Sequence, residues 1–337
     1  MIRTEFARIE LRKLSRTLYV HLGPRKTGTS AIQSALLRRD SSEVIYPKVG
    51  LWQDGAHHGL VFKFFGEDRK GKGSAQTFRE MLDEIAAVTA VNDHNVVISS
   101  EALRPGRDIA GFVDAVAHCL PQPVIVEFLI VCREHFSRAS SWYNHRTRSG
   151  KQEPPDEFLE KHGESVCYAP VLRQLQAIGH KIHVVNYHPS ETLVQRFLTG
   201  IGRSADDIPH DFTRKPALSP KALVLRLAIN NVVEDRRERA ALFARLKNMA
   251  DSYAPSQFIF SRDVAERAEL LYAADRTFLK DEFNIDVQSR DLTREQNMFL
   301  ISEQDLQDIM EVAAHLEGQA DEIVGYARQF VRSSCFS

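Results

Sequence analysis

The feature that most constrains the fold is an apolar run that stops at a glycine-containing loop and continues as a helical pattern. Residues Thr17 to Leu22 are mostly β-branched, aromatic or aliphatic, which predicts a buried strand. The loop Gly23 to Gly28 follows. From Thr29 to Arg39 apolar residues recur at helical spacing, and Thr29 or Ser30 can cap the first turn. The sequence therefore predicts a strand, a glycine loop and a helix in direct succession.

Four further apolar runs predict more strands, with helical patterns between them. They are Val44 to Tyr46, Asn95 to Ser99, Val124 to Cys132 and Lys181 to Asn186. Strands that alternate with helices favour a mostly parallel sheet, and near-continuous apolar strands indicate burial on both faces. The predicted fold class is α/β, with a central, mostly parallel sheet between two layers of helices. Ligands of such sheets bind beyond the carboxyl ends of the strands.

The last third of the chain has helical patterns and no further strand signal. They cover Pro220 to Ala250, Ser261 to Phe283 and Ser302 to Val331. The segment from Arg203 to Pro220, rich in aspartate, proline and charged residues, is the expected joint. We expect an α/β core over residues 1–215 and a helical portion over residues 216–337, packed together as two domains or as one.

Composition excludes several classes of protein. Lys and Arg number 44 against 45 Asp and Glu among 337 residues, so no global positive field would attract nucleic acid. The N-terminus has no apolar stretch typical of a signal peptide, and no run approaches the length of a membrane span. The four cysteines are scattered without a CxxC pair, which argues against disulfides and structural zinc. We expect a cytoplasmic protein; its oligomeric state is open.

The loop itself predicts an anion site. A glycine loop between a strand and a helix presents backbone N–H groups and the positive end of the helix dipole, which together bind phosphate. A nucleoside triphosphatase loop has the pattern GxxxxGK[ST]. In this chain Thr29 occupies the lysine position, and the lysine lies inside the loop as Lys26. An ammonium group there could contact the bridging oxygen of a bound anhydride.

The run Lys26-Thr27-Gly28-Thr29-Ser30 resembles the phosphosulfate-binding loop of the sulfotransferase family, KTGTT. The flanking residues His21 to Pro24 and Ile32-Gln33 are similar to the bacterial branch of that family. The resemblance implies a P-loop-like fold and 3'-phosphoadenosine 5'-phosphosulfate (PAPS) as donor. It further implies in-line transfer of a sulfuryl group without a metal, with Lys26 stabilising the leaving group. The implied donor contacts in this loop are Arg25, Lys26, Thr27, Gly28, Thr29 and Ser30.

A second motif follows the run Val124 to Cys132. Arg133 comes directly after it, and Ser141 lies eight residues further on. This resembles the 3'-phosphate motif of sulfotransferases, in which an arginine at a strand end and a serine in the next helix hold the donor's 3'-phosphate. Arginine suits the task because its planar fork donates several charge-assisted hydrogen bonds to phosphate. A nucleoside triphosphatase would instead need an acidic residue near this strand end for magnesium.

Sulfuryl transfer to a hydroxyl or amine also needs a base. Glu101 directly follows the run that ends in Ser99-Ser100, where related enzymes carry a histidine or an acidic residue, and is our first candidate. The pair His57 and His58 supplies the second, because an imidazole titrates near neutral pH. Each has a simpler alternative: Glu101 as a carboxylate at a helix N-terminus, and the histidines as solvated or structural groups.

Weaker similarity and open questions remain downstream. Arg214 and Lys215 resemble the Arg-Lys-Gly element with which cytosolic sulfotransferases grip the 3'-phosphate, although Pro216 replaces the glycine. The acceptor, whether a small molecule, a glycan or a lipid, cannot be assigned from the sequence. Two other functions stay open at this point: a P-loop kinase of a small molecule using ATP or GTP, with Glu101 holding magnesium, and a nucleotide-binding protein without turnover.

Overall fold

The computed structural model describes most of the chain. The described residues are 16–38, 44–67, 75–91, 93–187, 193–200, 217–247, 253–254, 258–292, 303–314 and 319–335. They divide into two compact units. What we call the sheet unit takes the described residues of Met1–Arg133, Tyr168–Phe212 and Asp281–Asp286, and the helical unit takes those of Glu134–Cys167, Thr213–Lys280 and Val287–Ser337.

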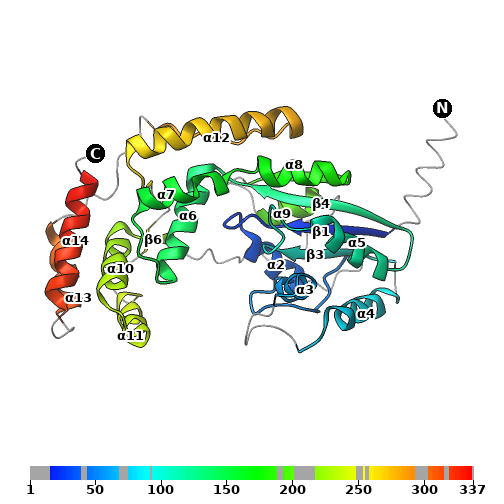
Figure 1. Ribbon diagram of the computed structural model, residues 1–337, viewed down its shortest axis with the longest axis horizontal. Helices are drawn as coiled ribbons and strands as arrows, with labels where there is room; N and C mark the ends of the chain where they lie inside the picture. The colour runs from blue at the N-terminus through cyan, green and yellow to red at the C-terminus, as the bar shows by residue number, and fades with distance from the viewer. Residues whose placement is uncertain are drawn as a thin grey trace. The chain divides into compact units, whose positions relative to one another are not determined.

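The sheet unit is built on five parallel strands in the order β2-β3-β1-β4-β5 (Figure 1). The strands are β1 (Arg16–Leu22), β2 (Val44–Ile45), β3 (Asn95–Ser100), β4 (Val124–Cys132) and β5 (Lys181–Asn186). The helices of this unit are α2 (Thr29–Arg38), α3 (His58–Phe64), α4 (Phe78–Thr89), α5 (Ile109–Cys119), α8 (Ala169–Ile178) and α9 (Leu193–Gly200). All five strands predicted from apolar runs are present, and their parallel pairing confirms the predicted fold class.

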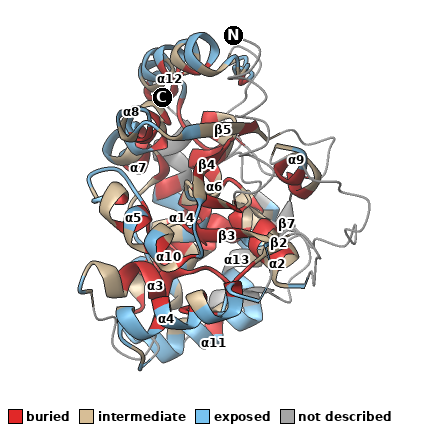
Figure 2. Cartoon of the chain, turned by 90° about the vertical axis from the view of Figure 1, so that its right-hand side faces the viewer, coloured by how far each residue is buried: buried red, intermediate tan, exposed pale blue. Residues whose placement is uncertain are grey.

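Helices cover both faces of this sheet. On one face Tyr19 and Val131 pack in a core cluster with Ile32 of α2 and Phe197 of α9. On the other face α5 contacts β4 and α8 contacts β5. Strands β1, β3 and β4 are largely buried (Figure 2), and residues that alternate along β1, such as Leu18, are inaccessible to solvent as well. The two-sided burial explains why these strands are almost continuously apolar in sequence.

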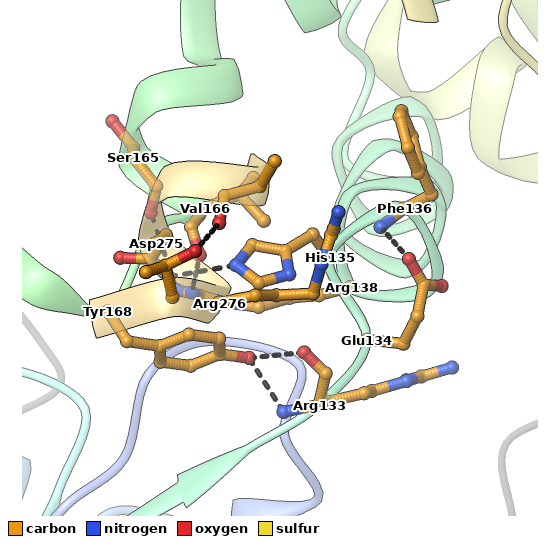
Figure 3. A network of polar contacts seen from close by, with 12 residues as sticks. Arg133, Glu134, His135, Phe136, Arg138, Ser165, Val166, Tyr168, Asp275 and Arg276 are labelled. Carbon is orange, nitrogen blue, oxygen red and sulfur yellow. Dashed lines mark hydrogen bonds and ion pairs between the residues drawn. The ribbon is translucent and has the colours of Figure 1, made fainter. Parts of the chain in front are cut away.

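The helical unit contains helices and one short two-stranded antiparallel sheet. Its elements are α6 (His135–Arg148), α7 (Pro155–His162), the 3-10 turn η1 (Gly163–Val166), β6 (Ala217–Leu218), α10 (Pro220–Val232), α11 (Arg236–Lys247), β7 (Tyr253–Ala254), α12 (Arg262–Phe283), α13 (Glu303–Ala313) and α14 (Ala320–Cys335). Residues 281–283 at the end of α12 are assigned to the sheet unit. One large core contains residues of α6, α7, α10, α11, α12 and α14, with Phe136, Leu227, Phe260 and Ile323 among its buried members. At the start of α6, His135 Nε2 lies 2.8 Å from Asp275 Oδ2 of α12, and both side chains are buried (Figure 3).

The helical patterns need two corrections. The pattern over Pro220 to Ala250 is interrupted between α10 and α11. The side chain of Asp235 accepts hydrogen bonds from the N–H groups of Arg237 and Glu238 at the start of α11. Because an N-cap residue has a non-helical backbone conformation, one continuous helix cannot run through Asp235. The expectation that strands cease after Ser219 is wrong for β7, which is only two residues long and therefore too short to give a periodic signal.

The division into units differs from the expected boundary. Residues 134–167 belong to the helical unit, although they precede 215 in the chain. The expected joint from Arg203 to Pro220 lies largely outside the described residues. Because a compact unit need not fold independently, the division into domains 1–215 and 216–337 stays a prediction.

Candidate functional site

The glycine loop joins β1, the central strand, to α2. Its backbone turns through two residues with positive φ, Lys26 at 69° and Gly28 at 89°. A lysine in this conformation is uncommon, because the left-handed region crowds a Cβ atom. Lys26 is half-buried, while Arg25 and Ser30 on either side are exposed. The loop therefore holds Lys26 in a strained geometry, which is characteristic of functional sites.

Two glycines allow the loop to close tightly. A Cβ atom on Gly23 would lie 2.1 Å from Thr29 Cγ2, and one on Gly28 would lie 2.1 Å from Leu193 Cδ2. The Thr27 hydroxyl donates to the Pro24 carbonyl at 2.7 Å, and the Gly28 carbonyl accepts from the N–H of Ala31 at 3.0 Å. Local contacts thus shape the turn, and larger residues at the two glycine positions would not fit without movement.

Glu101 lies against this loop. It directly follows β3, which pairs with β1, and its Oε1 atom accepts a hydrogen bond from the Thr29 hydroxyl. The parallel register brings Leu22 beside Ser100, so the residues after both strands meet at one edge of the sheet. A carboxylate at the start of α2 also favours the positive end of that helix. The structure therefore brings two of the predicted site residues, Thr29 and Glu101, into direct contact.

Arg133 reaches the same loop from the other neighbouring strand. Its Nη1 atom donates to the Lys26 carbonyl at 3.2 Å, and its guanidinium lies over the Tyr187 ring, 5.3 Å from the ring centroid. The backbone N–H and carbonyl of Arg133 both bond to the Tyr168 hydroxyl (Figure 3). Because β4 pairs with β1, the arginine predicted for a phosphate lies beside the loop predicted for a phosphate.

Two other parts of the predicted phosphate clamp are not brought to the loop by the described contacts. Ser141 lies in α6, in the helical unit, where it is half-buried. Arg214 and Lys215 lie outside the described residues. The roles assigned to these three residues stay predictions.

His57 has contacts that are typical of a structural histidine. It is fully buried; its Nδ1 atom accepts from the Ser99 N–H at 3.2 Å, and its Nε2 atom bonds to the Pro47 carbonyl at 2.8 Å. This pattern requires the tautomer with hydrogen on Nε2. Burial lowers the pKa of His57 from 6.5 to about 4. Both nitrogens are already used within the fold, so we do not carry His57 forward as a base.

His58 points elsewhere, although it is the next residue. It begins α3 and is 9% exposed, and its Nδ1 atom lies 2.8 Å from the Ser100 hydroxyl oxygen. Trp52 packs edge-on against its ring with centroids 5.0 Å apart. Since Ser100 directly precedes Glu101, the two remaining base candidates lie at the end of the same strand, β3.

Sequence reasoning missed a buried polar network under the loop. The hydroxyl oxygen of Ser99 accepts from Gln33 Nε2 at 3.0 Å and lies 2.8 Å from His21 Nδ1. Tyr46 also bonds to Ser99, and its own hydroxyl donates to the Gly55 carbonyl at 2.7 Å. The network ties α2, β1 and the segment before α3 to β3, and only the hydroxyls in otherwise apolar runs hinted at it.

The two buried histidines predict how stability depends on pH. Burial lowers the pKa of His21 from 6.5 to about 3 and that of His57 to about 4. Below pH 6.5 the unfolded chain binds protons that the folded chain does not, so the free energy of unfolding should fall by about 1.4 kcal/mol per pH unit for each group as pH decreases to about 4. Urea unfolding at several pH values measures this.

The substitution His57→Gln tests the origin of that dependence. We expect the variant to be less stable than wild type at neutral pH but to lose less stability on acidification, because one of the two titrating groups is gone. His118→Gln, at an exposed position, is the matched control for the change of residue type. A His57→Gln protein with the full wild-type slope would contradict the assignment of His57 as a buried neutral group.

Sheet order and loop together define the class of fold. A parallel sheet of order β2-β3-β1-β4-β5, with a glycine loop after its central strand and helices on both faces, is a P-loop-like α/β three-layer fold. None of the helices formed by the described residues combines the length and apolarity needed to cross a membrane. In the same part of the chain, no group of three His, Cys, Asp or Glu side chains is arranged to hold a metal ion.

Comparisons with known proteins assign this chain to no family. No family model matches the sequence, and no curated protein matches it. Among solved structures, a gluconokinase from Sinorhizobium meliloti 1021 is similar over 56% of this chain and 93% of its own, at 17% identity and a TM-score of 0.30. A sugar kinase from Janibacter sp. HTCC2649 is similar over 58% of this chain and 99% of its own, at 14% identity and a TM-score of 0.27. These scores are too low to carry an argument about activity.

Proposed function

We propose that this chain is a sulfotransferase that transfers the sulfuryl group of PAPS to a hydroxyl or amine of a small-molecule, glycan or lipid acceptor. The observation that carries the proposal is the 3.2 Å contact between Arg133 Nη1 and the Lys26 carbonyl. It brings the arginine of the 3'-phosphate motif beside the loop that would hold the 5'-phosphosulfate. The role of Ser141 as the second 3'-phosphate ligand is part of the same proposal.

The reaction needs little from the protein besides charge and a base. The acceptor oxygen or nitrogen forms a bond to the donor's sulfur, and the bond from sulfur to the bridging phosphate oxygen breaks. The electron pair stays on that oxygen, and adenosine 3',5'-bisphosphate leaves. Lys26 would stabilise the negative charge that develops on the bridging oxygen. The acceptor's proton would pass to a base at the end of β3, Glu101 or His58.

Glu101 and His58 can be distinguished by substitution. If Glu101 is the base, Glu101→Gln should lower kcat by about 100-fold or more, because the amide cannot accept the proton. His58→Gln should then keep most of the activity. Binding of adenosine 3',5'-bisphosphate should change little in either variant. Steady-state kinetics and calorimetry measure these quantities.

Glu84→Gln, at an exposed position on α4, controls for the loss of a carboxylate. The opposite pattern, with activity lost in His58→Gln and kept in Glu101→Gln, would transfer the base to His58. Glu101 would then have only its contact with Thr29, which fixes the start of α2.

A binding experiment tests the function directly. Calorimetry on the purified protein should show that adenosine 3',5'-bisphosphate binds more tightly than ADP or 5'-AMP, and sulfur-labelled PAPS should lose its label to some hydroxyl or amine compound in a screen. Absence of affinity for adenosine 3',5'-bisphosphate would refute the proposal. Affinity without transfer to any acceptor would favour a nucleotide-binding protein without turnover.

One observation favours a second candidate, a P-loop kinase of a small molecule. The acidic Glu101 lies at the end of the strand beside β1 and contacts the loop hydroxyl of Thr29. A carboxylate next to a loop hydroxyl could hold magnesium with a nucleoside triphosphate. A magnesium-dependent thermal shift with ATP, and none with adenosine 3',5'-bisphosphate, would favour this candidate over the sulfotransferase.

A further inference from the structure

Tyr168 holds the backbone of Arg133 at the end of β4. The Tyr168 hydroxyl accepts from the Arg133 N–H at 2.8 Å and donates to the Arg133 carbonyl at 2.8 Å (Figure 3). Tyr168 is inaccessible to solvent and precedes α8. Both residues belong to the sheet unit. A tyrosine 35 positions away in sequence therefore bonds to both the N–H and the carbonyl of Arg133, the residue proposed to bind the phosphate.

Arg133 is the first residue after β4. The last ladder pair of β4 joins Cys132 to Asn186, and Arg133 lies just beyond it. In an extended residue the N–H and the carbonyl point to the same side, so one hydroxyl can bond to both and thereby hold the residue extended. Leu129 and Val131 point into the core cluster that contains α2 and α9 residues. The Arg133 guanidinium lies over the Tyr187 ring, and Tyr187 packs against the same cluster, so the Arg133 side chain lies on that face of the sheet.

The direction of the Arg133 side chain matters because the guanidinium reaches the loop on that face. Its contacts there are the Lys26 carbonyl and the Tyr187 ring. A long arginine side chain loses considerable conformational entropy when it binds a phosphate. The loss is smaller if its backbone and the direction of its side chain are already held by other contacts. Tyr168 holds the Arg133 backbone, and the Lys26 carbonyl and the Tyr187 ring hold its guanidinium.

We infer that Tyr168 is a positioning residue that gives the proposed donor site its preference for a 3'-phosphate by holding Arg133. This inference rests on the proposed function, since it assigns the 3'-phosphate to Arg133. Tyr168 itself would not touch the nucleotide. The simpler alternative is that Tyr168 only stabilises the fold, in which case its loss would affect all nucleotides alike.

The preference for a 3'-phosphate separates these two roles. We define it as the Kd of 5'-AMP divided by the Kd of adenosine 3',5'-bisphosphate, both measured by calorimetry. Tyr168→Phe keeps the ring and removes both hydrogen bonds. We expect it to lower the preference about 10-fold through weaker binding of the bisphosphate, with the Kd of 5'-AMP nearly unchanged. Arg133→Ala should lower the preference about 100-fold.

A double-mutant cycle sharpens the test. If Tyr168 acts through the Arg133 side chain, Tyr168→Phe should cause no further loss of preference when Arg133 is already alanine. Tyr143→Phe is the matched control, because Tyr143 is also a buried tyrosine whose hydroxyl donates to a backbone carbonyl, that of Glu153 at 3.0 Å. It should keep the wild-type preference.

Each outcome decides one of the two proposals. A wild-type protein that does not prefer the bisphosphate overturns the proposed function and this inference with it. A wild-type preference that Tyr168→Phe leaves intact, or an equal loss for both nucleotides, overturns the inference alone. If Tyr168→Phe does not fold, amide hydrogen exchange on the wild type replaces it: the Arg133 N–H should be protected without ligand, and rapid exchange would overturn the inference.

Discussion

Replacing Lys26 with methionine is expected to lower kcat for the proposed sulfuryl transfer by about 100- to 1000-fold. The ammonium group would otherwise stabilise the charge that develops on the bridging oxygen, and methionine has a side chain of similar length without the charge. Methionine also has a Cβ atom, so the strain of φ 69° at this position is the same in both proteins. The loss should therefore appear in kcat while the free energy of unfolding stays close to wild type.

Two further variants separate charge from backbone geometry. Lys26→Gly removes the charge and also relieves the strain, so it should lose as much activity as Lys26→Met without losing stability. Lys48→Met, at an exposed position outside the loop, controls for the loss of one positive charge. Activity close to wild type in Lys26→Met would remove Lys26 from the proposed mechanism, whatever the nucleotide.

Gly28→Ala is expected to lower affinity for adenosine 3',5'-bisphosphate by about 100-fold, because the loop backbone must move. The new Cβ atom would lie 2.1 Å from Leu193 Cδ2, at a residue whose φ of 89° already disfavours alanine. The strain costs about 1 to 2 kcal/mol of folding stability. Overpacking against the buried Leu193 costs about 1 to 3 kcal/mol more. Calorimetry and urea unfolding measure the two effects.

Gly179 offers a closely matched control. It has the same φ of 89°, but a Cβ atom there would meet no atom within 4 Å. Gly179→Ala should therefore show the cost of the backbone conformation alone and keep nucleotide affinity. In the Gly28→Ala background, Leu193→Ala should relieve the overlap, so the double variant should be more stable than the sum of the two single effects predicts. Equal stability losses in Gly28→Ala and Gly179→Ala would contradict the proposed steric role of Leu193.

The strands could be predicted because burial requires apolar residues, which appear in the sequence as short apolar runs. The run Val124 to Cys132 has the same first and last residues as β4, because a strand covered on both faces is apolar along most of its length. Helix ends were harder to predict. The break between α10 and α11 depends on how Asp235 caps a helix, and an aspartate inside a polar pattern gives the same signal with or without a break.

The pair His57 and His58 shows where local pattern stops being informative. Adjacent histidines are equivalent as sequence, yet His57 bonds to Ser99 and Pro47 in the core, while His58 lies against Ser100. Successive residues at the start of a helix point in different directions, so their surroundings come from other segments. Only the contacts of the folded chain could therefore distinguish His57 from His58 as a candidate base.

By itself, the sequence determined the parallel sheet and the position of the glycine loop. These follow from apolar periodicity and from the conformations that glycine permits, both of which act over a few neighbouring residues. Only the tertiary structure decided that Glu101 and Arg133 reach the loop from the two strands beside β1, and that Tyr168 holds Arg133. Those contacts join residues between 35 and 107 positions apart, and strand order, which no local pattern encodes, brings them together.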